Sequence, residues 1–191
     1  MGFKVEVGVS NKHIHLTEAD LAKLFGAGHK LTVKKNLKQT GEFASEEVLD
    51  VAGPKGTLKS VRVLGPVRKE SQVELAITDA RSIGLTLPVR QSGVLENTPG
   101  VKLIGPKGEV NMARGAIIAL RHIHLSPAEA AEAGLKDKDI VTVKTTGSRP
   151  LVFGDVLIRV GNFIKEFHVD TDEANAAGIT NGDIAEIIGK Q

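Results

Sequence analysis

Four of the six histidines in this 191-residue chain lie in two copies of a His-Ile-His motif. The first copy spans residues 13–15 and the second spans residues 122–124. Because successive side chains of an extended chain point to opposite faces, the two imidazoles of each copy share one face. Such a pair could bind a metal ion, so the two copies predict either two ions or one ion held by both. The alternative is that each histidine is a hydrogen-bonded polar residue near a strand end.

Two other side chains could complete such sites. His168 alternates with Phe167 and Val169, so it faces away from the core if those two are buried, and it could supply a third imidazole. A surface histidine on an edge strand is an equal alternative. Glu74 lies within an alternating apolar run, where the pattern alone favours a solvent-facing carboxylate over a metal ligand.

Two short polar stretches could bind an anion. Arg68 follows a Gly-Pro turn, and a guanidinium held there could grip a phosphate or carboxylate through two hydrogen bonds. Ser92 precedes Gly93, and together they offer a hydroxyl and a backbone amide to an oxyanion. A surface arginine and an ordinary turn are the more frequent explanations of these patterns. The sequence contains no Walker loop, dinucleotide-binding glycine fingerprint or nucleophile elbow.

The composition excludes several classes of protein. A net charge of +2 and an aromatic content of 3% argue against a nucleic-acid partner. The absence of cysteine removes disulfides and a thiol nucleophile, and it fits a cytoplasmic location. No apolar run approaches the roughly 20 residues of a membrane span. The start of the chain leads directly into a strand pattern, so we expect neither a signal peptide nor a membrane partner.

Short strands dominate the elements that the sequence predicts. Three short helices are expected, one beginning after Thr17, one beginning after Ser126 and one spanning residues 170–177, and each ends at a glycine. Residues 38–47 read as a polar turn, and the Gly-Pro-Lys-Gly sequences at 53–56 and 105–108 read as hairpin turns. Many short strands with few helices predict β-barrels, and the duplicated motif predicts two. The predicted strands cover residues 3–9, 31–35, 58–64, 72–78, 85–89, 101–104, 115–120, 140–144, 156–160, 164–169 and 184–188.

Several motifs together make the chain resemble the PduL-type phosphotransacylases, also called phosphate propanoyltransferases. They keep their order over nearly the whole sequence, and their combination is highly specific although no single one is. The stretches that carry the resemblance are residues 8–16, 63–68, 72–74, 90–93, 121–124 and 168–176.

The resemblance implies two small β-barrels capped by short helices, with the His-x-His motifs at the crossovers between them. Residues 2–11 with 120–189 would form one barrel. Residues 12–119 would form the other, with a small hairpin excursion near 26–46. The family moves a short acyl group, such as propanoyl or acetyl, between coenzyme A and inorganic phosphate, and it holds two zinc ions between its barrels.

The resemblance also implies a role for individual residues. Acyl-coenzyme A and phosphate would be the substrates, and Arg68 would orient the phosphate for catalysis. One zinc, with a position open for the coenzyme A thiol, would be ligated by His122, His124 and His168. The second zinc would be ligated by His13, His15 and Glu74. The phosphate would be contacted by Arg68 and Ser92.

The sequence leaves other interpretations open. A di-zinc hydrolase of thioesters or phosphoesters and a non-enzymatic barrel protein with structural zinc would use the same ligands. We expect a homo-oligomer. Family members packaged in bacterial microcompartments often carry an amphipathic N-terminal extension that is not seen here. We therefore expect a cytoplasmic location, with a bacterial microcompartment as the alternative if such an extension was removed. Thr40 stands where the family usually has proline, in a stretch that contains no presumed ligand.

Overall fold

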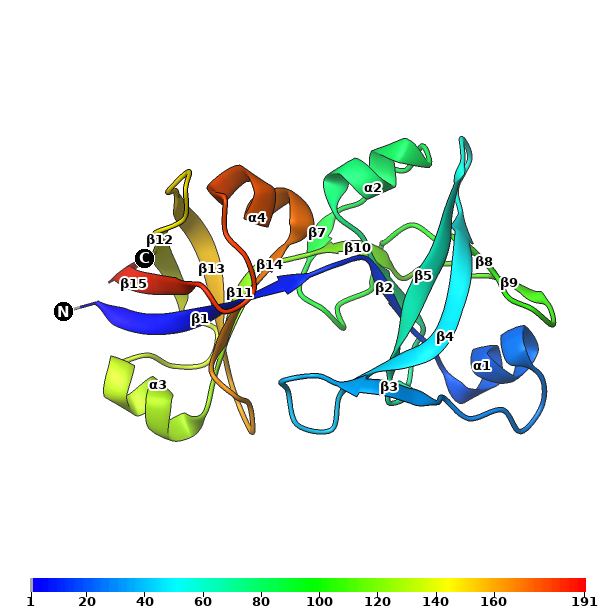
Figure 1. The fold of residues 1–191 in the computed structure, drawn as a ribbon, viewed down its shortest axis with the longest axis horizontal. Coiled ribbons are helices and arrows are strands. Elements are labelled where there is room, and N and C mark those ends of the chain that lie inside the picture. Colours follow the sequence, from blue (N-terminus) through cyan, green and yellow to red (C-terminus); the bar gives the residue numbers. More distant parts are fainter. Residues whose placement is uncertain (1) are drawn as a thin grey trace. The chain divides into compact units, whose positions relative to one another are not determined.

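A computed structural model describes residues 2–191 and divides the chain into two compact units. One unit combines the residues up to Asn11 with Leu120–Gln191, and the other is Lys12–Ala119. The described residues form fifteen short strands and four short helices (Figure 1). None of these helices has the length and apolar character needed to cross a membrane.

The first unit is a closed six-stranded barrel with the strand order β1-β14-β11-β13-β12-β15. Strand β1 runs parallel to β14 and antiparallel to β15, so the first and last strands of the chain lie side by side and close the barrel (Figure 1). The strands are β1 (Phe3–Ser10), β11 (His122–Leu125), β12 (Ile140–Thr145), β13 (Val152–Val160), β14 (Glu166–Asp170) and β15 (Ile184–Lys190).

Two helices of this unit follow directly on strands that carry histidines. Helix α3 (Pro127–Ala133) follows β11, and helix α4 (Thr171–Ala177) follows β14. Each begins with a capping box, in which the side chain of the cap residue and that of the third helical residue satisfy each other's backbone amides. Each ends at a left-handed glycine. The local sequence therefore stops both strands just beyond their histidines.

The second unit is a nine-stranded sheet with the order β7-β10-β6-β2-β5-β4-β8-β9, to which β3 adds by pairing with β4. Within the described residues, its two end strands do not pair, so hydrogen bonds close only the barrel of the first unit. The strands are β2 (His13–His15), β3 (Val33–Asn36), β4 (Phe43–Ala52), β5 (Thr57–Gly65), β6 (Gln72–Glu74), β7 (Val89–Arg90), β8 (Lys102–Ile104), β9 (Glu109–Asn111) and β10 (Ala116–Ala119). Its helices are α1 (Glu18–Phe25) and α2 (Ile77–Ser82).

The prediction of a mainly β, barrel-containing fold with short capping helices is confirmed. The two Gly-Pro-Lys-Gly sequences are hairpin turns as predicted: Gly53 N donates to Gly56 O at 2.9 Å, and Gly105 N donates to Gly108 O at 2.8 Å. The turns connect β4 to β5 and β8 to β9.

Three local predictions were wrong. Residues 85–89 were expected to be a strand, but only Val89 belongs to one, β7. Residues 38–47 were expected to be a turn, but β4 begins at Phe43, and its polar Ser45 and Glu47 are buried. Ser45 Oγ donates to Val63 O, and the Glu47 carboxylate accepts from Thr32 N, so partners inside the fold replace water. Residues 72–78 were expected to be one strand, but helix α2 begins at Ile77. Its cap residue, Ala76, makes no side-chain capping bond, so the sequence carries no start signal there.

Candidate functional site

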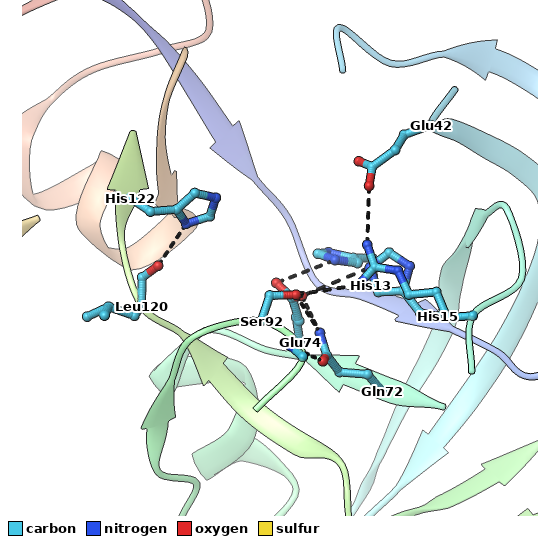
Figure 2. A network of polar contacts seen from close by, with 10 residues as sticks. His13, His15, Glu42, Gln72, Glu74, Ser92, Leu120 and His122 are labelled. Carbon is cyan, nitrogen blue, oxygen red and sulfur yellow. Dashed lines mark hydrogen bonds and ion pairs between the residues drawn. The ribbon is translucent and has the colours of Figure 1, made fainter. Parts of the chain in front are cut away.

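In the second unit, strand pairing brings together His13, His15 and Glu74. Strand β2 runs antiparallel to β6, with His13 opposite Glu74 and His15 opposite Gln72. His13 Nε2 lies 3.5 Å from Glu74 Oε2, and His15 Nε2 lies 4.0 Å from Glu74 Oε1 (Figure 2). One ligand atom from each of the three residues lies within 4.8 Å of the other two, so they could surround one ion. We call these three residues cluster A.

Every member of cluster A is buried, including Glu74, which is 9% exposed. The solvent-facing position that alternation favoured for Glu74 is therefore wrong, because both faces of the short strand β6 are covered. Burial alone would raise the pKa of the Glu74 carboxyl, but His13, His15 and the Ser92 hydroxyl hold it well below its ordinary value. Burial, His13 and Arg68 lower the pKa of His15. Cluster A thus offers a carboxylate and a neutral His15 imidazole, the forms that bind metal.

A hydrogen-bond network surrounds the Glu74 carboxylate. Ser92 Oγ donates to Glu74 Oε1 at 2.8 Å and accepts from Gln72 Nε2 at 2.9 Å, while Gln72 Nε2 also donates to Glu74 Oε1 (Figure 2). Gly93 N donates to Gln72 Oε1 at 2.8 Å. The sequence carries no functional signal at Gln72, although alternation from Glu74 places it on the same face of the strand. Gln72 holds the Ser92–Gly93 turn against the carboxylate.

Arg68 lies beside this network. Its Nη1 is 3.4 Å from Ser92 Oγ and its Nη2 is 3.2 Å from Glu42 Oε1, while its backbone N donates to Leu16 O at 2.8 Å. The guanidinium, which is about one-third exposed, and the Ser92 hydroxyl therefore lie close together next to cluster A. This arrangement can bind an anion, because it combines a permanent positive charge with hydrogen-bond donors.

In the first unit, His122, His124 and His168 lie together on one face of the barrel. His122 is directly opposite His168 in the antiparallel pair β11–β14, and their rings are 4.9 Å apart. The ring of His124 is 4.7 Å from that of His122 and 4.9 Å from that of His168. One nitrogen from each lies within 4.8 Å of the others, so these residues, which we call cluster B, could also surround one ion.

The nitrogens of cluster B fit a metal ion. His122 Nδ1 lies 2.9 Å from Leu120 O, and because a carbonyl only accepts, we assign the proton to Nδ1 and the lone pair to Nε2 (Figure 2). Neither buried ring nitrogen of His124 has a hydrogen-bond partner among residues 2–191. His168 Nε2 lies 3.1 Å from Glu166 Oε2 but without the geometry of a hydrogen bond. Burial, together with His122 and His168, lowers the pKa of His124 to about 2, so its imidazole is neutral at pH 7.

The remaining histidine, His29, belongs to neither cluster. Its Nε2 lies 2.9 Å from Glu47 Oε1, and its ring stacks on Phe25. The ordinary role that its turn sequence indicated is consistent with this pairing. All eight residues singled out from the sequence as ligands or anion contacts thus fall into cluster A with its Arg68–Ser92 neighbours or into cluster B.

The model of the phosphate propanoyltransferase family matches residues 6–180, which include both clusters. The chain belongs to this family. A phosphate propanoyltransferase from Thermotoga maritima is 55% identical over 95% of this chain and 88% of its own length. Those from Rhodopseudomonas palustris and Salmonella typhimurium are 49% and 48% identical, over 98% and 93% of this chain and 84% and 85% of their own lengths. As a phosphate propanoyltransferase family member, the chain is an acyltransferase, and the resemblance seen in its motifs is confirmed.

The lowered pKa values predict how acid affects the metal-free protein. His124 and His15 titrate below 6.5 in the folded chain, so between about pH 8 and pH 5.5 only the unfolded chain takes up protons at these residues. The free energy of unfolding of chelator-treated protein should therefore fall as the pH is lowered through this range. Urea unfolding at several pH values measures it. The variants His124→Gln and His15→Gln should each show a shallower fall, and an unchanged slope in both would contradict the assignment.

Proposed function

We propose that this protein is a metal-dependent phosphotransacylase that interconverts a short-chain acyl-coenzyme A and phosphate with an acyl phosphate and coenzyme A, the acyl group being propanoyl or acetyl. The observation that carries the proposal is the presence of two three-ligand clusters, of which the buried one lies beside the Arg68 guanidinium and the Ser92 hydroxyl. Membership of the family and the names of its relatives support it.

Zinc is the ion that the donors of both clusters suit best. Sets of three imidazoles, or of two imidazoles and one carboxylate, are typical of catalytic zinc sites, which keep one position open. We therefore assign one zinc to cluster A and one to cluster B, and the two units would be the two domains of the enzyme. When bound, zinc would favour the thiolate form of coenzyme A and polarise the acyl carbonyl.

The residues beside cluster A would bind phosphate. The Arg68 guanidinium offers two parallel donors and offsets the charge of the anion, while Glu42 at 3.2 Å holds the guanidinium in place. The Ser92 hydroxyl, held by Gln72, would contact a phosphate oxygen. In the forward reaction a phosphate oxygen forms a bond to the acyl carbon, the carbon–sulfur bond breaks, and the sulfur leaves as a thiolate. No residue needs to carry the acyl group, which fits the absence of cysteine.

The cluster B imidazoles would hold the second ion, which would supply a positive charge close to the thiolate leaving group. His122 is oriented by its bond to Leu120 O, and the neutral ring of His124 can bind metal without first losing a proton. Cluster B includes no carboxylate, so its ligands leave the charge of the ion undiminished.

The activity itself is tested by supplying the purified protein with propanoyl- or acetyl-coenzyme A. Release of free coenzyme A should require added phosphate, should produce acyl phosphate, and should stop after chelation and resume after zinc is restored. Release in water alone at the same rate would instead indicate a thioester hydrolase. Stable zinc without any turnover would indicate a structural metal.

The metal assignment predicts about two zinc ions per chain by elemental analysis, the number set by three protein ligands for each catalytic ion. His168→Ala should lower the zinc content by about one ion and abolish turnover, while circular dichroism shows an unchanged fold. The matched substitution His29→Ala lies outside both clusters and should keep the zinc content of the wild type. Full zinc content and activity in His168→Ala would remove it from the ligands.

Arg68 is predicted to act on phosphate and not on coenzyme A. Arg68→Ala should lower kcat/KM for phosphate by an amount equivalent to about 2–4 kcal/mol, the scale of one lost oxyanion-stabilising donor. Arg68→Lys keeps the charge but loses the fork, so it should fall between. Zinc content should stay unchanged. Arg114→Ala is the matched control, because Arg114 also pairs with a glutamate, Glu70, but lies outside the site. Unaltered phosphate kinetics in zinc-loaded Arg68→Ala would contradict the role.

A further inference from the structure

His124 is oriented differently from His122, its neighbour in cluster B. A metal-binding histidine usually donates its second ring N–H to an acceptor, which fixes the plane of the ring. His122 has such an acceptor in Leu120 O, whereas His124 has none within residues 2–191. Instead, the ring of Phe163 stacks on the imidazole of His124, with centroids 4.1 Å apart and planes at 17°.

The ring of Phe163 is itself held in place from the backbone. It lies in the loop between β13 and β14, next to Gly161, whose N donates to Leu125 O at 3.0 Å, one residue beyond His124. A Cβ atom on Gly161 would lie 2.7 Å from Cε2 of Phe163, so the ring occupies the space that only a glycine leaves open. The loop is therefore tied to the strand that carries His124 at the point where the two rings meet.

A cation completes this arrangement. The guanidinium of Arg159 lies 5.6 Å from the centroid of the Phe163 ring, within the range of a cation–π contact. Arg159 is also opposite His124 in the parallel pair β11–β13. The Phe163 ring thus contacts β11 through the stack on His124 and β13 through Arg159. These two contacts restrict the rotation of the Phe163 ring.

We propose that Phe163 is a positioning residue that sets the plane of the His124 imidazole and thereby raises the metal affinity of cluster B. The rotation of an imidazole about its second side-chain bond is soft, so a ring without a hydrogen-bonded partner needs another constraint. A flat aromatic face supplies it through stacking, while both ring nitrogens stay uncommitted until a metal binds. The inference rests on the proposed function, in which cluster B holds a metal ion.

The test measures metal binding itself. In a background with His13→Ala and His15→Ala, cluster B is the metal site that remains, and Co²⁺ can be titrated into it against a competing chelator. Phe163→Leu should weaken Co²⁺ binding about 10-fold or more, the lower end of the loss caused by removing a group that orients a ligand. It should also alter the visible ligand-field bands of bound Co²⁺. Phe163→Tyr keeps the aromatic face and should restore both.

Two further variants distinguish a loss of orientation of the Phe163 ring from a general loss of side-chain packing. Gly161→Ala leaves Phe163 in the sequence but displaces its ring, because the new Cβ would lie too close to it. It should therefore weaken Co²⁺ binding as Phe163→Leu does. It also provides the test if Phe163→Leu fails to fold. Phe3→Leu is the matched control: Phe3 is in the same unit and its ring meets the cation of Lys165, but it makes no ring contact with a histidine of residues 2–191. Phe3→Leu should leave binding unchanged.

The outcomes distinguish the two proposals. Wild-type affinity and spectrum in Phe163→Leu or in Gly161→Ala would overturn the positioning role and leave the metal site standing. Failure of the background protein to bind Co²⁺ at all would overturn the cluster B metal site, and the positioning role with it.

Discussion

The two-residue alternation of β-strands is the constraint on which both clusters depend. In β11, Ile123 and Leu125 are fully buried in the barrel core, so His122 and His124 are directed to the opposite face. In β14 the same holds for Phe167 and Val169 on either side of His168. A shift of one residue in the register of either strand would turn the histidines into the core and expose the apolar side chains. Such a shift would strongly destabilise the barrel. The core thereby fixes the positions of the ligands, and capping boxes end both strands immediately afterwards.

Concentrating imidazoles in this way works against stability. Burial and mutual repulsion lower the pKa of His124, so at neutral pH the residue is an uncharged polar group whose two ring nitrogens have no hydrogen-bond partner within residues 2–191. Unsatisfied polar atoms of this kind normally destabilise a fold. The burial of apolar side chains in the two cores offsets this destabilisation, as is common where a protein has unpaired polar groups at a ligand-binding site. A metal ion that binds only the folded chain would increase the free energy of unfolding and so offset part of this destabilisation.

The sequence was informative wherever a local pattern decided the structure. The faces on which the His-x-His pairs and His168 lie followed from alternation, and the starts of α1 and α3 followed from their capping residues. It was misleading where distant contacts decided. Ser45 and Glu47 are inside β4 because Val63 and Thr32 supply their partners, and Glu74 is buried because the turn at Ser92, 18 residues away, covers it. Helix α2 has no side-chain cap, and the role of Gln72 exists only once Ser92 and Gly93 are in place.

The two clusters differ in the charge of their ligands, and this difference supports a division of labour. Cluster A includes the Glu74 carboxylate, which cancels one charge of a divalent ion, and it has the Arg68 guanidinium nearby to attract an anion. The ligands of cluster B are imidazoles, of which His124 is neutral, and the carboxylate of Glu166 lies outside this ligand set, 3.1 Å from His168 Nε2. A site with more uncompensated positive charge stabilises a thiolate better, because the electrostatic attraction acts on a full negative charge in a partly buried environment. Ligand charge thus agrees with the assignment that the resemblance to the family implies, in which phosphate binds beside cluster A and the sulfur of coenzyme A binds at cluster B.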